Sequence, residues 1–285
     1  MGRRLKLSNR KQLIGLVFVS PWVLGFLIFT LFPLFTTVMY SFNTVRFKLG
    51  GIETTFVKMK NYTDVLLKDP GFKLALPEYL VDLFFFVPMV LVFSIMLSLL
   101  LNAELKGRSL FRALFFLPVI IISGPVIENI QAMGAASLQG LSNFPVYRFI
   151  HDSIPNFIAA PILYVFENAV LILWYTGVQT LIFLSAMQKI DKSIYEASMV
   201  DGASSWQQFW KITIPTIKPF IFLNAVYTIV DVSMSTMNPV ITEIKKAMFD
   251  IKKGFGFASA ASWIYFLIIL SAILLSYLLF GREEK

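Results

Sequence analysis

Ionisable side chains are rare within the long apolar stretches of this sequence, and those that occur there are the first candidates for chemistry. Glu167 lies in the apolar stretch 158–187, and Asp231 lies in the stretch 216–234. A carboxylate at the centre of a membrane costs about 2.5–3.5 kcal/mol on insertion scales, so it normally faces a cavity or a partner. Both residues are therefore candidates for the lining of a polar path.

Aromatic and amide residues accompany the two carboxylates at helical spacing. The candidate path residues fall on two helix faces, with Tyr164, Glu167 and Trp174 on the first and Asn224, Tyr227 and Asp231 on the second. Aromatic faces stack on the C–H faces of sugar rings, while carboxylates and amides bind sugar hydroxyls, so both faces suit a sugar. Two other interpretations stay open. Polar groups can hold membrane helices together, and Tyr and Trp can lie in the aromatic belts at the membrane surface.

No enzyme signature accompanies these residues. The sequence lacks the G-x-x-x-x-G-K-[ST] phosphate loop, so the chain cannot hydrolyse ATP through that machinery. The single histidine, His151, has no partner for a Ser/His/Asp set, and there is no cysteine for a disulfide or a thiolate metal site. We expect no catalysis, no metal and no bound cofactor on this chain.

The polar segment 188–215 is predicted to form two short helices joined at a glycine. Asp191 can cap the start of the first helix, and Gly202 can follow its end, where a left-handed backbone is cheapest for glycine. Ser204 to Gln207 fits a capping box for the second helix. The first helix has a surface that could lie in a groove of another protein, but an amphipathic helix resting on lipid fits these properties equally well.

Six apolar stretches position these residues. Hydrophobic residues make up 57% of the 285, charged residues only 15%, and the mean hydropathy is +0.72, whereas soluble domains have about 25% charged residues. A helix needs about 20 residues to cross the hydrocarbon. The predicted spans are 14–42, 79–102, 111–131, 158–187, 216–234 and 258–280. We therefore expect an all-α membrane protein with one transmembrane domain, 1–285.

The basic residues favour an orientation with both termini in the cytoplasm. In that orientation the inner segments hold 14 of the 25 Lys and Arg, and the longer outer segments hold the other 11. The basic residues lie almost wholly between apolar runs, so the net charge of +8 does not indicate a nucleic-acid partner. The first apolar run is too long for a signal peptide and lacks a small-x-small cleavage site, so we expect it to remain as a span.

The segment 188–215 resembles the EAA loop of ABC importer permeases. That loop reads Glu-Ala-Ala, three residues, Gly, nine residues and Ile-x-Leu-Pro, and this chain has Glu196-Ala197-Ser198, Gly202 and Ile212-Thr213-Ile214-Pro215. Ser198 stands in place of Ala, and Ile214 in place of Leu. The resemblance implies a cytoplasmic coupling helix that docks on an ATPase. The implied coupling residues are Tyr195, Glu196, Ala197, Ser198, Asp201, Gly202, Ala203, Ile212 and Pro215.

Further segments resemble sugar permeases of the maltose-transporter type. These segments are Ser20-Pro21-Trp22, Asn61-Tyr62-Thr63, Phe116-Leu117-Pro118 and Asp201-Gly202-Ala203. Two positions depart from the family pattern. Glu78-Tyr79 stands where an Asn-Thr pair usually opens the second span, and Met237-Asn238-Pro239 stands where a Gly-Gly-Pro stretch is usual. These departures leave the identity of the sugar open.

The resemblance implies a type I ABC importer permease fold in a multi-pass protein of the cell membrane. The implied partners are a second homologous permease, two cytoplasmic ATPase subunits that bind ATP-Mg, an extracytoplasmic substrate-binding protein, membrane lipid and a sugar. Movement of the ATPases would switch the spans between two packed states and so give alternating access. The alternative is an ion-coupled secondary transporter or channel that uses Glu167 and Asp231. Inverted repeats would favour this alternative, and we find none.

Overall fold

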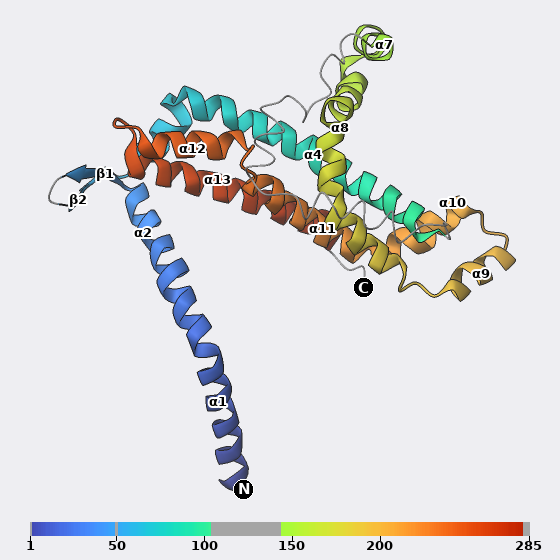
Figure 1. The fold of residues 1–285 in the computed structure, drawn as a ribbon, viewed down its shortest axis with the longest axis horizontal. Coiled ribbons are helices and arrows are strands. Elements are labelled where there is room, and N and C mark those ends of the chain that lie inside the picture. Colours follow the sequence, from blue (N-terminus) through green and yellow to red (C-terminus); the bar gives the residue numbers. More distant parts are fainter. Residues whose placement is uncertain (1, 49–50, 104–143, 282–285) are drawn as a thin grey trace. The chain divides into compact units, whose positions relative to one another are not determined.

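The computed structural model describes residues 2–48, 51–103 and 144–281 (Figure 1). Within these ranges the chain is mostly helical, as predicted. Five of its helical segments are long and apolar enough to cross a membrane. The predicted span 111–131 lies outside the described residues.

The other five predicted spans each coincide with a helical segment. These segments are α1 (Gly2–Phe26) continued by α2 (Phe32–Ser41), α4 (Pro70–Asn102), α8 (Asn156–Met187), α11 (Ile214–Met234) and α13 (Gly254–Ser276). Helix α4 begins earlier than the predicted residue 79. The reason is local, because Asp69 accepts a hydrogen bond from the amide of Phe72 (2.8 Å) and proline is favoured at the first helical position.

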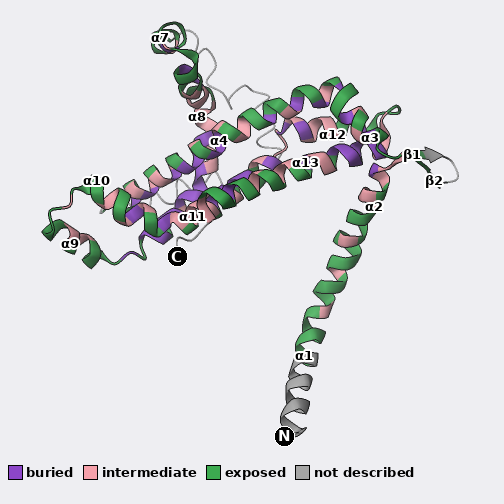
Figure 2. Ribbon diagram, turned by 180° about the vertical axis from the view of Figure 1, so that it is seen from behind, coloured by how far each residue is buried: buried purple, intermediate pink, exposed green. Residues whose placement is uncertain are grey.

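The first of two compact units comprises residues 1–73 and 243–266. Helices α1 and α2 are joined by a π-helical turn, Leu27–Leu31, and none of the residues in the most apolar part of Ile14–Ser41 is buried (Figure 2). An apolar helix surface of this extent requires lipid or another subunit to cover it. Helix α2 leads into an antiparallel hairpin of β1 (Asn43–Lys48) and β2 (Gly51–Phe56).

Close contacts fix the end of α2 within this unit. Asn61 in α3 (Lys60–Thr63) donates hydrogen bonds to the backbone oxygens of Ser41 (2.9 Å) and Asn43 (3.0 Å). A Cβ atom on Gly256 of α13 would collide with the carbonyl group of Asn43. Only glycine therefore permits this approach of α13.

A buried ion pair lies beside these contacts. The side chain of Asp69 is 5% exposed and pairs with Lys253, whose Nζ lies 5.2 Å from the centre of the Phe257 ring. A buried carboxylate is tolerated only when it is paired and hydrogen-bonded. Asp69 meets both conditions through Lys253 and the amide of Phe72.

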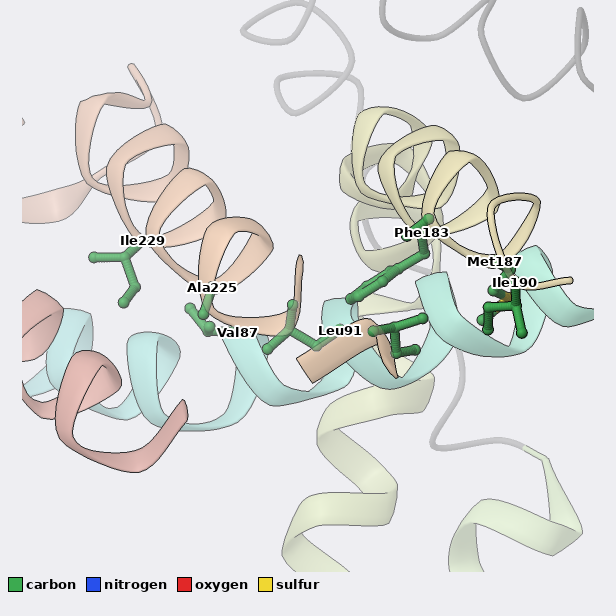
Figure 3. Packing of buried hydrophobic residues seen from close by; sticks show 9 residues of the cluster. Val87, Leu91, Phe183, Met187, Ile190, Ala225 and Ile229 are labelled. Atoms are coloured by element: carbon green, nitrogen blue, oxygen red, sulfur yellow. The ribbon is translucent and has the colours of Figure 1, made fainter. Parts of the chain in front are cut away.

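The second unit comprises residues 74–242 and 267–285, and its core lies between α4, α8 and α11 (Figure 3). Helix α4 contributes Val87 and Leu91, and Phe183 of α8 is fully buried against them. Helix α11 contributes Ala225 and Ile229. A short helix, α7 (Pro145–Ser153), precedes α8.

Buried polar side chains cross-link the three helices of this core. The hydroxyl of Ser98 in α4 donates to the backbone oxygen of Thr180 in α8 (2.8 Å). The Nε2 of Gln179 in α8 donates to the hydroxyl of Thr228 in α11 (3.0 Å). Small polar residues allow membrane helices to approach closely and to hydrogen-bond where no water is present.

The structure contains two elements that the sequence analysis did not predict. The segment 43–75 contains the hairpin, and the segment 235–257 contains helix α12 (Pro239–Phe249). Both have a sequence signal in hindsight. Polar and apolar residues alternate from Thr44 to Phe47 before a glycine pair, as in a strand, and Val240, Ile244 and Ala247 recur at helical spacing.

Candidate functional site

The segment after α8 folds as the predicted pair of helices, α9 (Lys192–Val200) and α10 (Ser205–Gln208). The side chain of Asp191 accepts a hydrogen bond from the amide of Ser193 (3.0 Å) at the start of α9. This bond holds the pKa of the Asp191 carboxyl below its ordinary value. The cap therefore stabilises α9 at neutral pH and is lost as the pH falls through that lowered pKa.

The turn between the two helices has the expected geometry. Gly202 has φ +81°, and the amide of Ala203 donates to the backbone oxygen of Ser198 (2.9 Å), as in a Schellman motif. Ser204 and Gln207 form a capping box at the start of α10. The prediction of two helices jointed at glycine is confirmed.

Side chains of α9 contact the chain that follows α10. The hydroxyl of Tyr195 lies 2.8 Å from the hydroxyl of Thr213, at the end of the π-helical turn Phe209–Thr213 that leads into α11. The Nε2 of Gln208 donates to the backbone oxygen of Tyr195 (3.2 Å) and to the hydroxyl of Ser198 (2.8 Å). The sequence analysis did not single out Gln208 or Thr213, because no local pattern marks a contact across the turn.

The predicted coupling residues divide into an exposed set and an anchored set. Glu196, Ala197, Asp201 and Gly202 are exposed, as is Pro215 in the first turn of α11. Tyr195 and Ile212 are half-buried and pack against the core of the second unit. Apolar side chains of α9 are also uncovered, with Met199 58% and Val200 89% exposed. Figure 2 shows α9 as largely exposed. This exposed surface is available to another molecule.

A recess of about 180 Å³ lies in the second unit, among α4, α8 and the chain that follows α11. Carboxylates, amides and aromatic rings line it together. The lining residues are Glu78, Tyr79, Asp82, Phe86, Tyr164, Asn168, Leu171, Tyr175, Val232, Ser235, Met237, Asn238 and Pro239. No lysine or arginine is among these described lining residues.

Hydrogen bonds hold the walls of the recess in place. The hydroxyl of Tyr164 donates to the Oδ1 of Asp82 (3.0 Å), and the hydroxyl of Tyr79 lies 2.5 Å from that of Ser233. The buried Asn238 accepts hydrogen bonds from the amides of two residues that follow it. Such a recess offers fixed acceptors and ring faces, the groups that bind sugar hydroxyls and sugar C–H faces.

Only one of the candidate path residues on α8 faces the recess. Tyr164 lines it, whereas Glu167 is exposed and accepts a hydrogen bond from the hydroxyl of Tyr147 in α7 (2.5 Å). That bond raises the pKa of Tyr147 above its ordinary value. The indole Nε1 of Trp174 is buried and has no hydrogen-bond partner among the described residues.

The candidates on α11 also lie in different surroundings. Asn224 is fully buried, and its Nδ2 lies 3.5 Å from the backbone oxygen of Gln179 in α8. This placement fits the helix-packing interpretation that the sequence left open. Tyr227 is 40% exposed and Asp231 is exposed. A role for either in a path stays a prediction.

The sequence analysis did not predict that several lining residues of the recess form a site, although it singled out two of the segments that contain them. Glu78-Tyr79 and Met237-Asn238-Pro239 are the two departures from the family pattern, and they form part of one recess. The spacing of Glu78 and Asp82 puts both carboxylates on one face of α4. Nothing in a single sequence indicates that these positions meet, because about 160 residues separate the two segments.

No family model matches the chain. Three relatives carry the names of transport permeases. The probable ABC transporter permease YesP of Bacillus subtilis is 26% identical over 276 residues, which cover 92% of this chain and 88% of YesP. The lactose transport system permease LacF of Rhizobium radiobacter is 28% identical over 99% of this chain and 98% of LacF. The arabinooligosaccharide permease AraP of Bacillus subtilis is 30% identical over 73% of this chain and 65% of AraP.

Solved structures share the fold. A bacterial ABC transporter involved in the import of the acidic polysaccharide alginate has a chain that matches 99% of this one, with a TM-score of 0.66 and 19% identity. The alginate transporter in complex with a periplasmic protein that holds an alginate pentasaccharide matches 96% of it, with a TM-score of 0.63. With its apolar helices, the chain is a multi-pass protein of the plasma membrane. It belongs to the permease subunits of ABC transporters, and its relatives include named permeases of sugar transport systems.

Proposed function

We propose that this chain is the permease subunit of an ATP-driven, binding-protein-dependent importer of a sugar or oligosaccharide. The observation that carries the proposal is its relationship, over nearly its whole length, to permeases named for sugar transport, such as LacF. The chain itself performs no catalysis. Its task is to bind and release the sugar as the spans change their packing.

The α9–α10 segment is the proposed contact with the ATPase. Its support is the match to the EAA loop together with the exposed surface of α9 around Glu196 and Val200. In this proposal ATP-Mg binds to two cytoplasmic ATPase subunits, and their closure pushes α9. A second homologous permease and an extracytoplasmic binding protein complete the complex. The presence of a periplasmic protein in the related alginate complex supports the latter partner.

The recess is the proposed contact with the sugar, together with Tyr227 and Asp231 on α11. Tyr164 and Phe86 offer ring faces, and Asp82 offers acceptors for hydroxyl groups. The described lining holds carboxylates and no cation, so it favours a neutral or basic sugar over an acidic one. The alginate transporter shares the fold only, at 19% identity, and its substrate does not transfer to this chain.

The topology prediction is six spans in one domain, 1–285, with both termini and the segment 188–215 in the cytoplasm. The chain has no cysteine, so single cysteines report on their own positions. Val200→Cys, at a position 89% exposed, should react with a membrane-impermeant maleimide only after the cells are permeabilised. Thr54→Cys, in the exposed strand β2, is the matched control and should react in intact cells. Labelling of Val200→Cys in intact cells would show that this segment lies outside the cell and would contradict the predicted orientation.

Gly202 tests the coupling role. A Cβ at this position meets nothing within 4 Å, so a substitution acts through the backbone at φ +81° alone. Valine is strained there by about 1–2 kcal/mol, whereas asparagine tolerates the left-handed region. Gly202→Val should lower ATP-driven uptake by about tenfold, and Gly202→Asn should keep most of it. Uptake, retention of the ATPase on purification and hydrolysis stimulated by loaded binding protein are measured together. If Gly202→Val has normal uptake, ATPase retention and stimulated hydrolysis, the coupling role is contradicted and α9–α10 is a helix pair on the lipid surface.

Asp82 tests the recess. Asp82→Asn removes a charge and weakens the bond from Tyr164, so the KM for sugar uptake should rise by about three- to tenfold while assembly is kept. Tyr164→Phe removes the same bond and should act in the same direction. Asp152→Asn, on the exposed surface of α7, is the control and should leave KM unchanged. Unchanged KM for both recess variants would exclude the recess from the path.

A further inference from the structure

The side chain of Gln208 joins the two helices of the α9–α10 segment. It is the last residue of α10 and is half-buried. Its Nε2 donates both to the backbone oxygen of Tyr195 (3.2 Å) and to the hydroxyl of Ser198 (2.8 Å), so one amide group holds two positions of α9. These acceptors are one helical turn apart and present a single edge of α9 to Gln208.

A second link lies beside the first. The hydroxyl of Tyr195 meets the hydroxyl of Thr213 at 2.8 Å, and Thr213 is 4% exposed. Thr213 immediately precedes α11 and is therefore part of the helical run that enters the membrane core. The ring of Tyr195 also packs against the apolar core of the second unit. Tyr195 is thus held by Gln208 at its backbone and by Thr213 at its side chain.

Most residues of α9 are exposed, and the chain on its C-terminal side passes through the glycine turn at Gly202. Hydrogen bonds between half-buried groups are directional, so they fix the angle of a short helix better than apolar contact alone. Without the links from Gln208 and Thr213, a force on α9 would rotate the helix about its two turns instead of moving α11.

We propose that Gln208 is a positioning residue that, with Tyr195 and Thr213, makes α9 and the start of α11 move as one piece. This inference rests on the proposed function, in which the ATPase pushes α9. It adds the path by which that push reaches α11. It also gives Ser198 a role, because the serine hydroxyl, which stands where the related loops have alanine, supplies the second acceptor for Gln208.

The test uses the complete complex of permeases, ATPases and binding protein in proteoliposomes, and it measures ATP hydrolysed per sugar imported. Gln208→Leu should raise this ratio by about three- to tenfold, because ATPase closure then moves α9 without moving α11. The amount of ATPase that co-purifies should stay as in the unmodified complex. Hydrogen exchange of the α9 backbone amides should become faster in the same variant.

Milder variants keep the test decisive if Gln208→Leu fails to assemble. Ser198→Ala should raise the ratio of ATP hydrolysed to sugar imported less than Gln208→Leu does. Ser198→Thr keeps the hydroxyl and should leave this ratio as in the unmodified complex. Tyr195→Phe and Thr213→Val remove the same hydrogen bond, so the double variant should be no worse than either single variant. Ser205→Ala, at an exposed position of α10, is the control and should change nothing.

The outcomes separate this inference from the function on which it rests. If the unmodified complex imports no sugar with ATP, the proposed function fails, and the inference that rests on it fails as well. If the unmodified complex imports sugar and the variants at Gln208, Ser198 and Thr213 keep its ratio of ATP to sugar, the inference is overturned while the function stands.

Discussion

The absence of water within a bilayer is the constraint on which the structure depends. A backbone group that crosses the hydrocarbon must find its hydrogen bond within the protein, so the chain crosses as helices. Several polar side chains follow the same rule. In the core of the second unit, the hydroxyl of Ser98 bonds to the backbone of Thr180, and Gln179 bonds to Thr228. Polar residues in these helices can thus serve helix packing, and polarity alone does not identify a substrate path.

Two places in the second unit are candidates for function. In the recess, α4, α8 and the chain after α11 bring carboxylates, amides and aromatic rings together. The α9–α10 segment joins the end of α8 at Met187 to the start of α11 at Ile214. Polar side chains cap its two helices, and backbone hydrogen bonds close its turn. Alternating access then requires that a movement of the second place alter the first through α8 and α11, which link the two.

The five spans within the described residues could be predicted from the sequence because length and hydropathy decide them locally. The helix pair at 188–215 could also be predicted, since Asp191, Gly202 and Ser204 carry caps and turns that depend on neighbours a few residues away. The hairpin and α12 were not predicted, because their strands have only six residues each and the helix eleven, so their periodic signal is short. The recess could not be predicted, because the contact of Asp82 with Tyr164 joins residues that are 82 positions apart. The contact of Glu167 with Tyr147 also joins two helices, so the sequence did not predict it, and Glu167 was assigned to a path instead.

The central claim is that this chain carries sugar across the membrane by energy from ATP bound to partner subunits. The most direct measurement is sugar uptake by proteoliposomes that contain the purified complex, with ATP inside or outside and with ion gradients abolished by ionophores. The account predicts uptake that requires ATP on the side of the ATPases and loaded binding protein on the other side, and that is indifferent to the ionophores. Uptake that needs no ATP and stops when the proton or sodium gradient is removed would contradict it.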